Sequence, residues 1–133
     1  MIVLDASAAI ELLLNTPLGR RVAARLREDP EASLHAPELI FVEVAQVMRR
    51  FARSGAVDDL RASLVLADLR QLGMETCEHD VLLDRIWRLR DNLTAYDAAY
   101  VALAEALGAS LLTTDERLGR SSGHRAMIEV ITR

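Results

Sequence analysis

Four acidic residues have the side-chain type and the surroundings that metal chemistry requires. They are Asp5, Glu43, Asp97 and Asp115. Mg²⁺ and Mn²⁺ prefer oxygen ligands, and they keep several waters that substrate phosphates can replace. Carboxylates held close together raise one another's pKa unless a cation offsets their charge. Four carboxylates brought together in the folded protein would suit metal-assisted cleavage of a phosphodiester by water. This reaction needs no His, Ser or Cys nucleophile.

Asp97 raises the sharpest question, because it begins an otherwise apolar segment, TAYDAAYVALA at residues 94–104. A helix that is apolar nearly all round is usually buried, and an ionised carboxylate is costly to bury without a partner. The spacing of Thr94 and Asp97 fits a capping box, and an acid in the first turn suits the helix dipole. Two interpretations therefore remain open for Asp97, a helix cap or a metal ligand.

The other three acids have structural alternatives as well. Asp5 follows the apolar run at 2–4 and could cap a helix at 6–14. Asp115 could be a turn residue or the N-cap of the segment ERLGR. Glu43 is followed by polar residues three and seven positions later, which could form an ordinary solvated stripe. Position alone does not decide between these interpretations.

Two hydroxyls and one further acid lie near these positions in the sequence. Ser7 and Glu11 share a face of the first predicted helix, so either could lie near Asp5. Ser7 could orient a metal-bound water or be a simple first-turn serine. Thr113 would share a sheet face with Asp115 if its strand continued that far, and it is otherwise a β-branched strand former. No role is assigned to Glu11.

Short apolar runs alternate with helical segments along the chain, which predicts an α/β fold with a mostly parallel sheet of four to five strands and helices on both faces. Ligands of such sheets gather beyond the carboxyl ends of the strands, where Asp5 and Asp115 lie. If strands 2–4 and 110–113 are neighbours, the four carboxylates can converge on one edge. The predicted strands are 2–4, 33–36, 74–78, 110–113 and 128–131, and the predicted helices are 6–14, 17–28, 37–53, 59–72, 80–90 and 94–108.

Composition and charge narrow the class of protein. The 133 residues are 51% hydrophobic and 27% charged, which is typical of one soluble globular domain spanning 1–133. A net charge of −4 argues against a generic polyanion binder, although an acidic site that loads a cation becomes locally positive. The single Cys77 cannot form an internal disulfide, and no apolar run is long enough to cross a bilayer. We therefore expect a cytoplasmic protein with no membrane partner.

Other catalytic motifs are missing from the sequence. The three histidines have no Cys or His partner at zinc-ligand spacing, and there is no glycine-rich phosphate loop or G-x-S-x-G elbow. A phosphotransfer receiver domain fits poorly, because it needs a switch lysine and all the basic residues here are arginines.

Three segments, MIVLDASAAIELLL, PELIFVEVAQVMRR and LTAYDAAYVALAEALGASLLTTDERL, resemble those of a PIN domain, and more narrowly of the VapC toxins of type II toxin–antitoxin pairs. The resemblance extends over essentially the whole chain. It implies a PIN-like fold and an endoribonuclease that depends on Mg²⁺, with Mn²⁺ as a substitute. The acidic positions of the family fall on Asp5, Glu43, Asp97 and Asp115, as catalytic and metal-binding residues, and its supporting hydroxyls fall on Ser7 and Thr113.

The resemblance also implies partners. It predicts an RNA substrate, a homodimer, and a VapB-like antitoxin whose C-terminal segment reaches the acidic cleft and can carry an arginine. The apolar helices at 38–53 and 59–72 could form the contact surfaces, with core packing as the alternative. A different function remains open, in which a non-catalytic PIN-like module uses the acidic cleft to dock a basic peptide.

Overall fold

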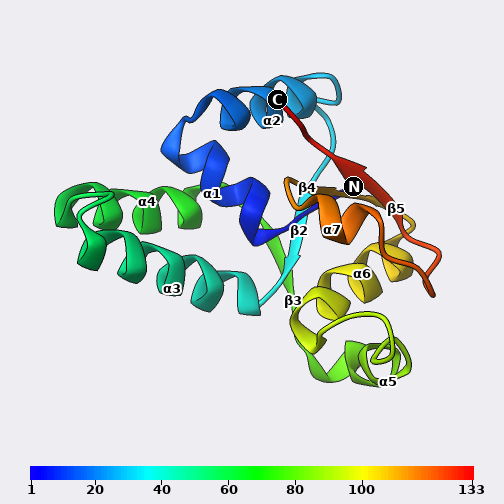
Figure 1. Ribbon diagram of the computed structural model, residues 1–133. Helices are drawn as coiled ribbons and strands as arrows, with labels where there is room; N and C mark the ends of the chain where they lie inside the picture. The colour runs from blue at the N-terminus through cyan, green and yellow to red at the C-terminus, as the bar shows by residue number, and fades with distance from the viewer.

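The computed structural model describes all residues, 1–133, and its centre is a five-stranded parallel sheet in the order β3-β2-β1-β4-β5 (Figure 1). Each crossover between strands is helical, as a parallel sheet requires. The strands are β1 Ile2–Leu4, β2 Leu34–Pro37, β3 Glu75–Cys77, β4 Ser110–Thr113 and β5 Met127–Val130. The predicted α/β class is confirmed, and the sheet is parallel throughout.

β1 is the central strand, paired with β2 on one side and β4 on the other. Its three residues, Ile2, Val3 and Leu4, are all buried. Successive side chains of a strand point to opposite faces of the sheet, so both faces must be covered at this point. This burial explains why the segment is a continuous apolar run and does not alternate with polar residues.

Seven helices and one 3₁₀ turn surround the sheet, and Figure 1 shows α3 and α4 as an adjacent pair that extends to one side. The six predicted helices lie close to their predicted positions except at residues 80–90, and the short helix at Glu116–Gly119 was not predicted. The helices are α1 Ala6–Leu14, α2 Pro17–Arg27, α3 Leu39–Ser54, α4 Asp59–Gln71, α5 Leu83–Arg88, α6 Ala95–Leu107 and α7 Glu116–Gly119, and the 3₁₀ turn η1 is Asp80–Leu82. None of the helices combines the length and the apolar run needed to cross a membrane.

Two details differ from the sequence predictions. Pro37 does not open the third helix but ends β2, opposite Cys77 of β3. The pairing of β2 with β1 stops at His35, so the missing N–H of Pro37 costs no hydrogen bond on that side. The helix predicted at 80–90 was wrong as a single element, because it is split at Leu82 into η1 and the short α5. α5 then ends where the backbone leaves helical geometry at Leu89.

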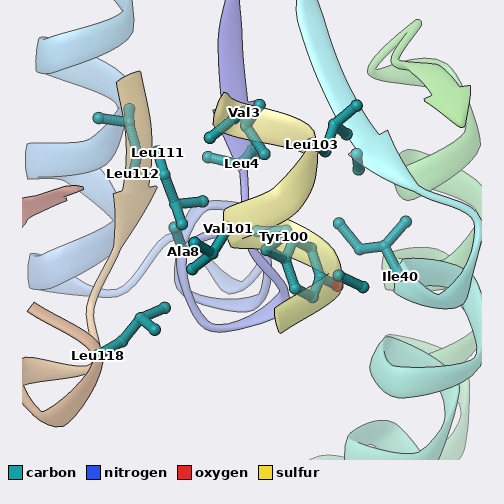
Figure 2. Close-up of a cluster of buried hydrophobic side chains, with 14 of the residues drawn as sticks. Val3, Leu4, Ala8, Ile40, Tyr100, Val101, Leu103, Leu111, Leu112 and Leu118 are labelled. Atoms are coloured by element: carbon teal, nitrogen blue, oxygen red, sulfur yellow. The ribbon is translucent and has the colours of Figure 1, made fainter. Parts of the chain in front are cut away.

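α6 passes through the middle of the core. Its seven consecutive residues from Ala98 to Ala104 are buried, and Figure 2 shows Tyr100, Val101 and Leu103 of this helix among apolar side chains of β1 and β4. Gly108 ends the helix in the left-handed conformation (φ 62°), which a residue without Cβ adopts at little cost. A helix packed on all sides has little freedom to turn, so the direction of its first-turn side chains is set by the core.

A single acid anchors the other end of α6. The side chain of Glu105 is only 2% exposed, and the Arg85 guanidinium donates two hydrogen bonds to it, at 2.7 and 2.9 Å. The backbone N–H of Arg125 donates a third, at 2.8 Å. The bonds from Arg85 and Arg125 lower the pKa of Glu105 to about 2. Through this one carboxylate, α6 is fixed to α5 and to the segment that leads into β5.

We expect Glu105→Gln to lower the free energy of unfolding by about 2 kcal/mol at pH 7, because the charge-assisted bonds are lost. The folded-state pKa lies below the usual value, so the contribution is complete above about pH 4.5 and disappears as the pH falls toward 2. Urea unfolding of both proteins from pH 7 to pH 2 should show the difference shrinking. Glu116→Gln, which removes an exposed pair with Arg120, is the control and should change little. A Glu105 effect independent of pH would contradict this account.

Candidate active site

The register of the sheet brings the ends of two strands together. β1 pairs with β4 with Leu4 opposite Leu112, so Asp5 and Thr113 follow side by side at the carboxyl edge. The backbone N–H of Asp5 also donates to the Leu112 carbonyl at 3.1 Å. The predicted adjacency of these two strands is therefore confirmed.

Asp5 is buried, and three protein donors hold its carboxylate. Oδ1 accepts hydrogen bonds from the Ser7 hydroxyl at 2.7 Å and from the Ala8 backbone N–H at 2.9 Å, and Oδ2 accepts one from the Thr113 hydroxyl. The bond from Ala8 makes Asp5 the N-cap of α1. Burial raises the pKa of Asp5 although these bonds lower it, and the nearby charge of Asp97 raises it further.

The two hydroxyls link Asp5 to the turn that carries Asp115. A hydroxyl has one proton, and both Ser7 and Thr113 donate theirs to Asp5. Each oxygen then accepts a backbone N–H from beyond β4, Ser7 from Thr114 and Thr113 from Asp115, both at 3.0 Å. The strand ends at Thr113, so Asp115 does not share its sheet face, and the connection runs through these bonds instead.

The cap of α6 is supplied by Thr94 and not by the side chain of Asp97. The Thr94 hydroxyl accepts the backbone N–H of Asp97 at 3.2 Å, so Thr94 caps α6. No backbone N–H donates to the Asp97 carboxylate, and the return bond of a capping box is therefore not made. Burial raises the pKa of Asp97, the charge of Asp115 raises it further, and Arg117 and the Thr94 hydroxyl lower it in part. The carboxylate thus faces other acids more than its own backbone.

Glu43 reaches the same group of charges from α3. The Tyr100 hydroxyl donates to Glu43 Oε1 at 2.6 Å. Burial raises the pKa of Glu43, the bond from Tyr100 lowers it in part, and the charges of Asp97 and Asp5 raise it again. The charge of Asp97 therefore raises the pKa of both Asp5 and Glu43, so these three carboxylates lie close enough to share one electrostatic environment.

Asp115 differs from the other three because it has a basic neighbour. Its Oδ1 accepts the backbone N–H of Arg117 at 2.9 Å, which caps α7, and its Oδ2 accepts from the Arg117 guanidinium at 3.1 Å. Burial alone would raise the pKa of Asp115, but the bonds and charge of Arg117 outweigh it, so the pKa lies below its ordinary value. Arg117 therefore already compensates the charge of this acid.

The four acids lie near one another, but no three Asp, Glu, His or Cys side chains are grouped tightly enough to enclose a single metal ion as they stand. Protein donors engage the oxygens of Asp5 and Asp115 and one oxygen of Glu43, and like charges do not draw together without a cation between them. The donor set is nevertheless of the kind that Mg²⁺ and Mn²⁺ accept, oxygen atoms with excess negative charge. The residues fit a divalent cation in chemistry, and an ion would have to draw the side chains closer.

A groove of about 560 Å³ opens beside the acidic edge. Side chains of α1 and α3 and Tyr96 of α6 line it, and most of the lining is apolar. Ser7 and Glu43 belong to its wall, and Arg50 lies on the same wall. The groove therefore adjoins the acidic residues and shares one of them, Glu43.

Other sequence candidates have structural partners. Glu11 accepts a hydrogen bond from the Thr16 hydroxyl at the corner between α1 and α2, so its side chain is turned away from Asp5. The three histidines also have hydrogen-bond partners outside the acidic group. His35 contacts the Ser33 hydroxyl, His79 accepts the backbone N–H of Leu39, and His124 accepts that of Ala126.

Sequence reasoning missed two residues that contact the acids. Tyr100 lies one turn after Asp97, and its position on an apolar helix gave only the signal of a core residue. Arg117 lies two positions after Asp115 and was only one of several available arginines. No sequence motif reveals the contact of Tyr100 with Glu43 or that of Arg117 with Asp115. The only signal was the i, i+3 spacing of Asp97 and Tyr100, which puts these two residues on one face of a helix.

Comparison with known families agrees with this geometry. Residues 2–123 match the family model described as PIN domain. The chain belongs to the PIN-domain family.

Two relatives from Mycobacterium tuberculosis extend the match to the whole chain. Ribonuclease VapC12 is 42% identical over 131 residues, covering 98% of this chain and 99% of the relative. Ribonuclease VapC9 is 43% identical over 136 residues, covering all of both chains. Within the family this PIN domain belongs with the VapC-type toxins.

Solved structures show the same fold. PAE2754 from Pyrobaculum aerophilum has a TM-score of 0.66 and 25% identity, covering 96% of this chain and 87% of that one. The sarcin–ricin loop cleaving toxin VapC20 from Mycobacterium tuberculosis has a TM-score of 0.67 and 15% identity, covering 94% of this chain and 97% of the other. At that lower identity the likeness concerns the fold of this PIN domain alone.

We expect Asp97→Asn to raise the melting temperature of the PIN domain in EDTA by roughly 4 °C, which corresponds to about 1 kcal/mol. The substitution removes a partly buried charge that repels its acidic neighbours. The gain should exceed the small loss of the favourable dipole interaction in the first turn. Differential scanning calorimetry measures the shift, with the exposed Asp68→Asn on α4 as the control that should change little. A lower melting temperature for Asp97→Asn would show that its carboxylate is mainly a stabilising cap.

Proposed function

We propose that this chain is an endoribonuclease toxin of a toxin–antitoxin pair, which cleaves RNA phosphodiester bonds with a divalent cation. Mg²⁺ is the expected ion and Mn²⁺ its substitute. The observation that carries the proposal is the convergence of Asp5, Glu43 and Asp97 at the carboxyl edge of the sheet, where the charge of Asp97 raises the pKa of both Asp5 and Glu43. Relatives named as VapC ribonucleases, 42–43% identical over the whole chain, support it.

In this proposal Asp5, Glu43 and Asp97 hold the principal ion, and Asp115 supports it or a second ion. When bound, the ion would activate water and stabilise the leaving oxygen. Ser7 and Thr113 serve by fixing the Asp5 carboxylate, since both hydroxyl protons are donated to it.

Asp115 can take part only if its pairing with Arg117 opens. The guanidinium is exposed and lies on a flexible side chain, so it can move from the carboxylate without disturbing the core. Released from Asp115, it would lie beside the site as a donor suited to phosphate oxygens.

The partners belong to the same proposal. We assign a VapB-like antitoxin to the groove beside the acidic edge, because its mostly apolar wall includes Glu43 and can receive an apolar segment that carries a positive side chain. The solved complex of VapBC2 from Rickettsia felis, a structural neighbour at 12% identity, supports this assignment only through the shared fold. We further propose a homodimer that acts in the cytoplasm, with residues 1–133 as one domain.

The carboxylates should be needed for turnover and not for folding. Asp5→Asn and Asp97→Asn should each lower cleavage of an RNA substrate at saturating Mg²⁺ by at least about a hundredfold, because each removes a charged ligand. Gel assays of cleavage, with circular dichroism to verify folding, measure both effects, and Asp68→Asn is the control. Normal cleavage by Asp97→Asn would overturn its role as a ligand. If the unaltered protein neither cleaves RNA nor gains thermal stability from Mn²⁺, a peptide-docking module would explain the acidic edge better.

The groove assignment predicts a local effect on antitoxin binding. Val42 lines the groove and Leu60 lies on α4 outside it, and both side chains are 72% exposed, so the same substitution at each is a matched pair. Val42→Asp should weaken binding of the cognate antitoxin at least tenfold, since an added charge opposes burial and lies near Glu43. Leu60→Asp should bind as the unaltered protein does. Isothermal titration calorimetry measures the antitoxin affinity of both variants. Weaker binding by Leu60→Asp with normal binding by Val42→Asp would show that the interface lies on α4 and not in the groove.

A further inference from the structure

Tyr100 makes a contact that its position in the core does not require. Its side chain is 2% exposed, and Figure 2 shows the ring lying between α6 and Ile40 of α3. A phenylalanine could fill the same space with the same apolar surface. The hydroxyl, however, donates to Glu43 Oε1 at 2.6 Å, a bond between residues 57 positions apart.

This bond is the only one that a protein donor makes to the Glu43 carboxylate. Glu43 lies on the wall of an open groove, and a long side chain in that place has many rotamers available to it. The remaining oxygen, Oε2, has no protein donor. A buried phenol that holds one oxygen therefore selects the direction of the whole side chain and leaves the other oxygen available.

The kind of donor also matters. Arg117 neutralises Asp115 with a positive charge, whereas a phenol directs a carboxylate without cancelling its charge. The bond from Tyr100 therefore fixes the direction of Glu43 and adds no positive charge beside it.

We propose that Tyr100 is a positioning residue that holds Glu43 toward Asp5 and Asp97, so that the carboxylates are arranged for a divalent cation before it binds. The proposal rests on the function proposed above and deepens it. α6 then contributes twice to the site, with Asp97 in its first turn and Tyr100 in the next. The buried helix gives both side chains the same rigid support.

The test is Tyr100→Phe, which removes one oxygen and keeps the ring. Isothermal titration calorimetry with Mn²⁺ and no RNA should show binding about tenfold weaker than in the unaltered protein. Cleavage should fall about tenfold at limiting Mg²⁺ and recover largely at high Mg²⁺, because the intact Glu43 can still bind once the ion is abundant. Ser33→Ala removes a partly buried hydroxyl that contacts His35 in β2, away from the acidic edge, and should alter neither measurement.

A double-mutant cycle with Glu43→Gln separates positioning from general stability. In the Glu43→Gln background, Tyr100→Phe should have no further effect on Mn²⁺ affinity, because the group it directs is gone. An equal loss in both backgrounds would mean that the hydroxyl acts only through stability and would overturn the proposal. Unaltered Mn²⁺ affinity in Tyr100→Phe would overturn it too and leave the proposed function intact. No Mn²⁺ binding and no cleavage by the unaltered protein would overturn both.

Discussion

The carboxylate of Asp5 links the sheet to the acidic edge, and the rest of the site depends on how it is held. It is buried between β1 and β4, where an unpaired charge would be expensive, so it must have donors. Two hydroxyls and one backbone N–H provide them, and the same hydroxyls accept backbone groups from the turn that leads to Asp115. The cost of burying one charge is thus offset by bonds that also fix the relative position of two acids. Stability and site geometry have the same physical origin at this point.

The remaining acids are supported in two contrasting ways. Asp115 has a positive partner in Arg117 and an ordinary helix-capping role, which together lower its pKa. Glu43 has only the neutral hydroxyl of Tyr100, and its pKa is raised. The negative charge of Asp115 is therefore compensated without a cation, whereas that of Glu43 is not. The excess negative charge is concentrated on the side of the edge formed by α3 and α6, and a cation would gain most there.

The sequence predicted those features of the fold that depend on residues close together in the chain. Asp5 ends an apolar run, Thr94 begins a helix, and the alternation of strands and helices predicted the parallel sheet. Long-range contacts were not visible in the same way, because hydrogen bonds such as that between Tyr100 and Glu43 join residues that share no pattern. Pro37 was misplaced for a similar reason. Whether a proline ends a strand or opens a helix depended on where the pairing with β1 stopped, and only the register of the sheet determines that.

Glu43 lies both at the acidic edge and in the wall of the groove, so under the proposed function one residue can contact either a cation or a bound partner. An apolar segment lying in the groove would bring its side chains within reach of the same carboxylate that a cation needs. A positive side chain on that segment would offset the same excess negative charge, so partner and cation would gain from one interaction and could not both gain fully. Because Tyr100 directs the side chain without neutralising it, Glu43 stays receptive to either. The protein would then be inhibited by occupation of its own acidic edge, with no change of fold required.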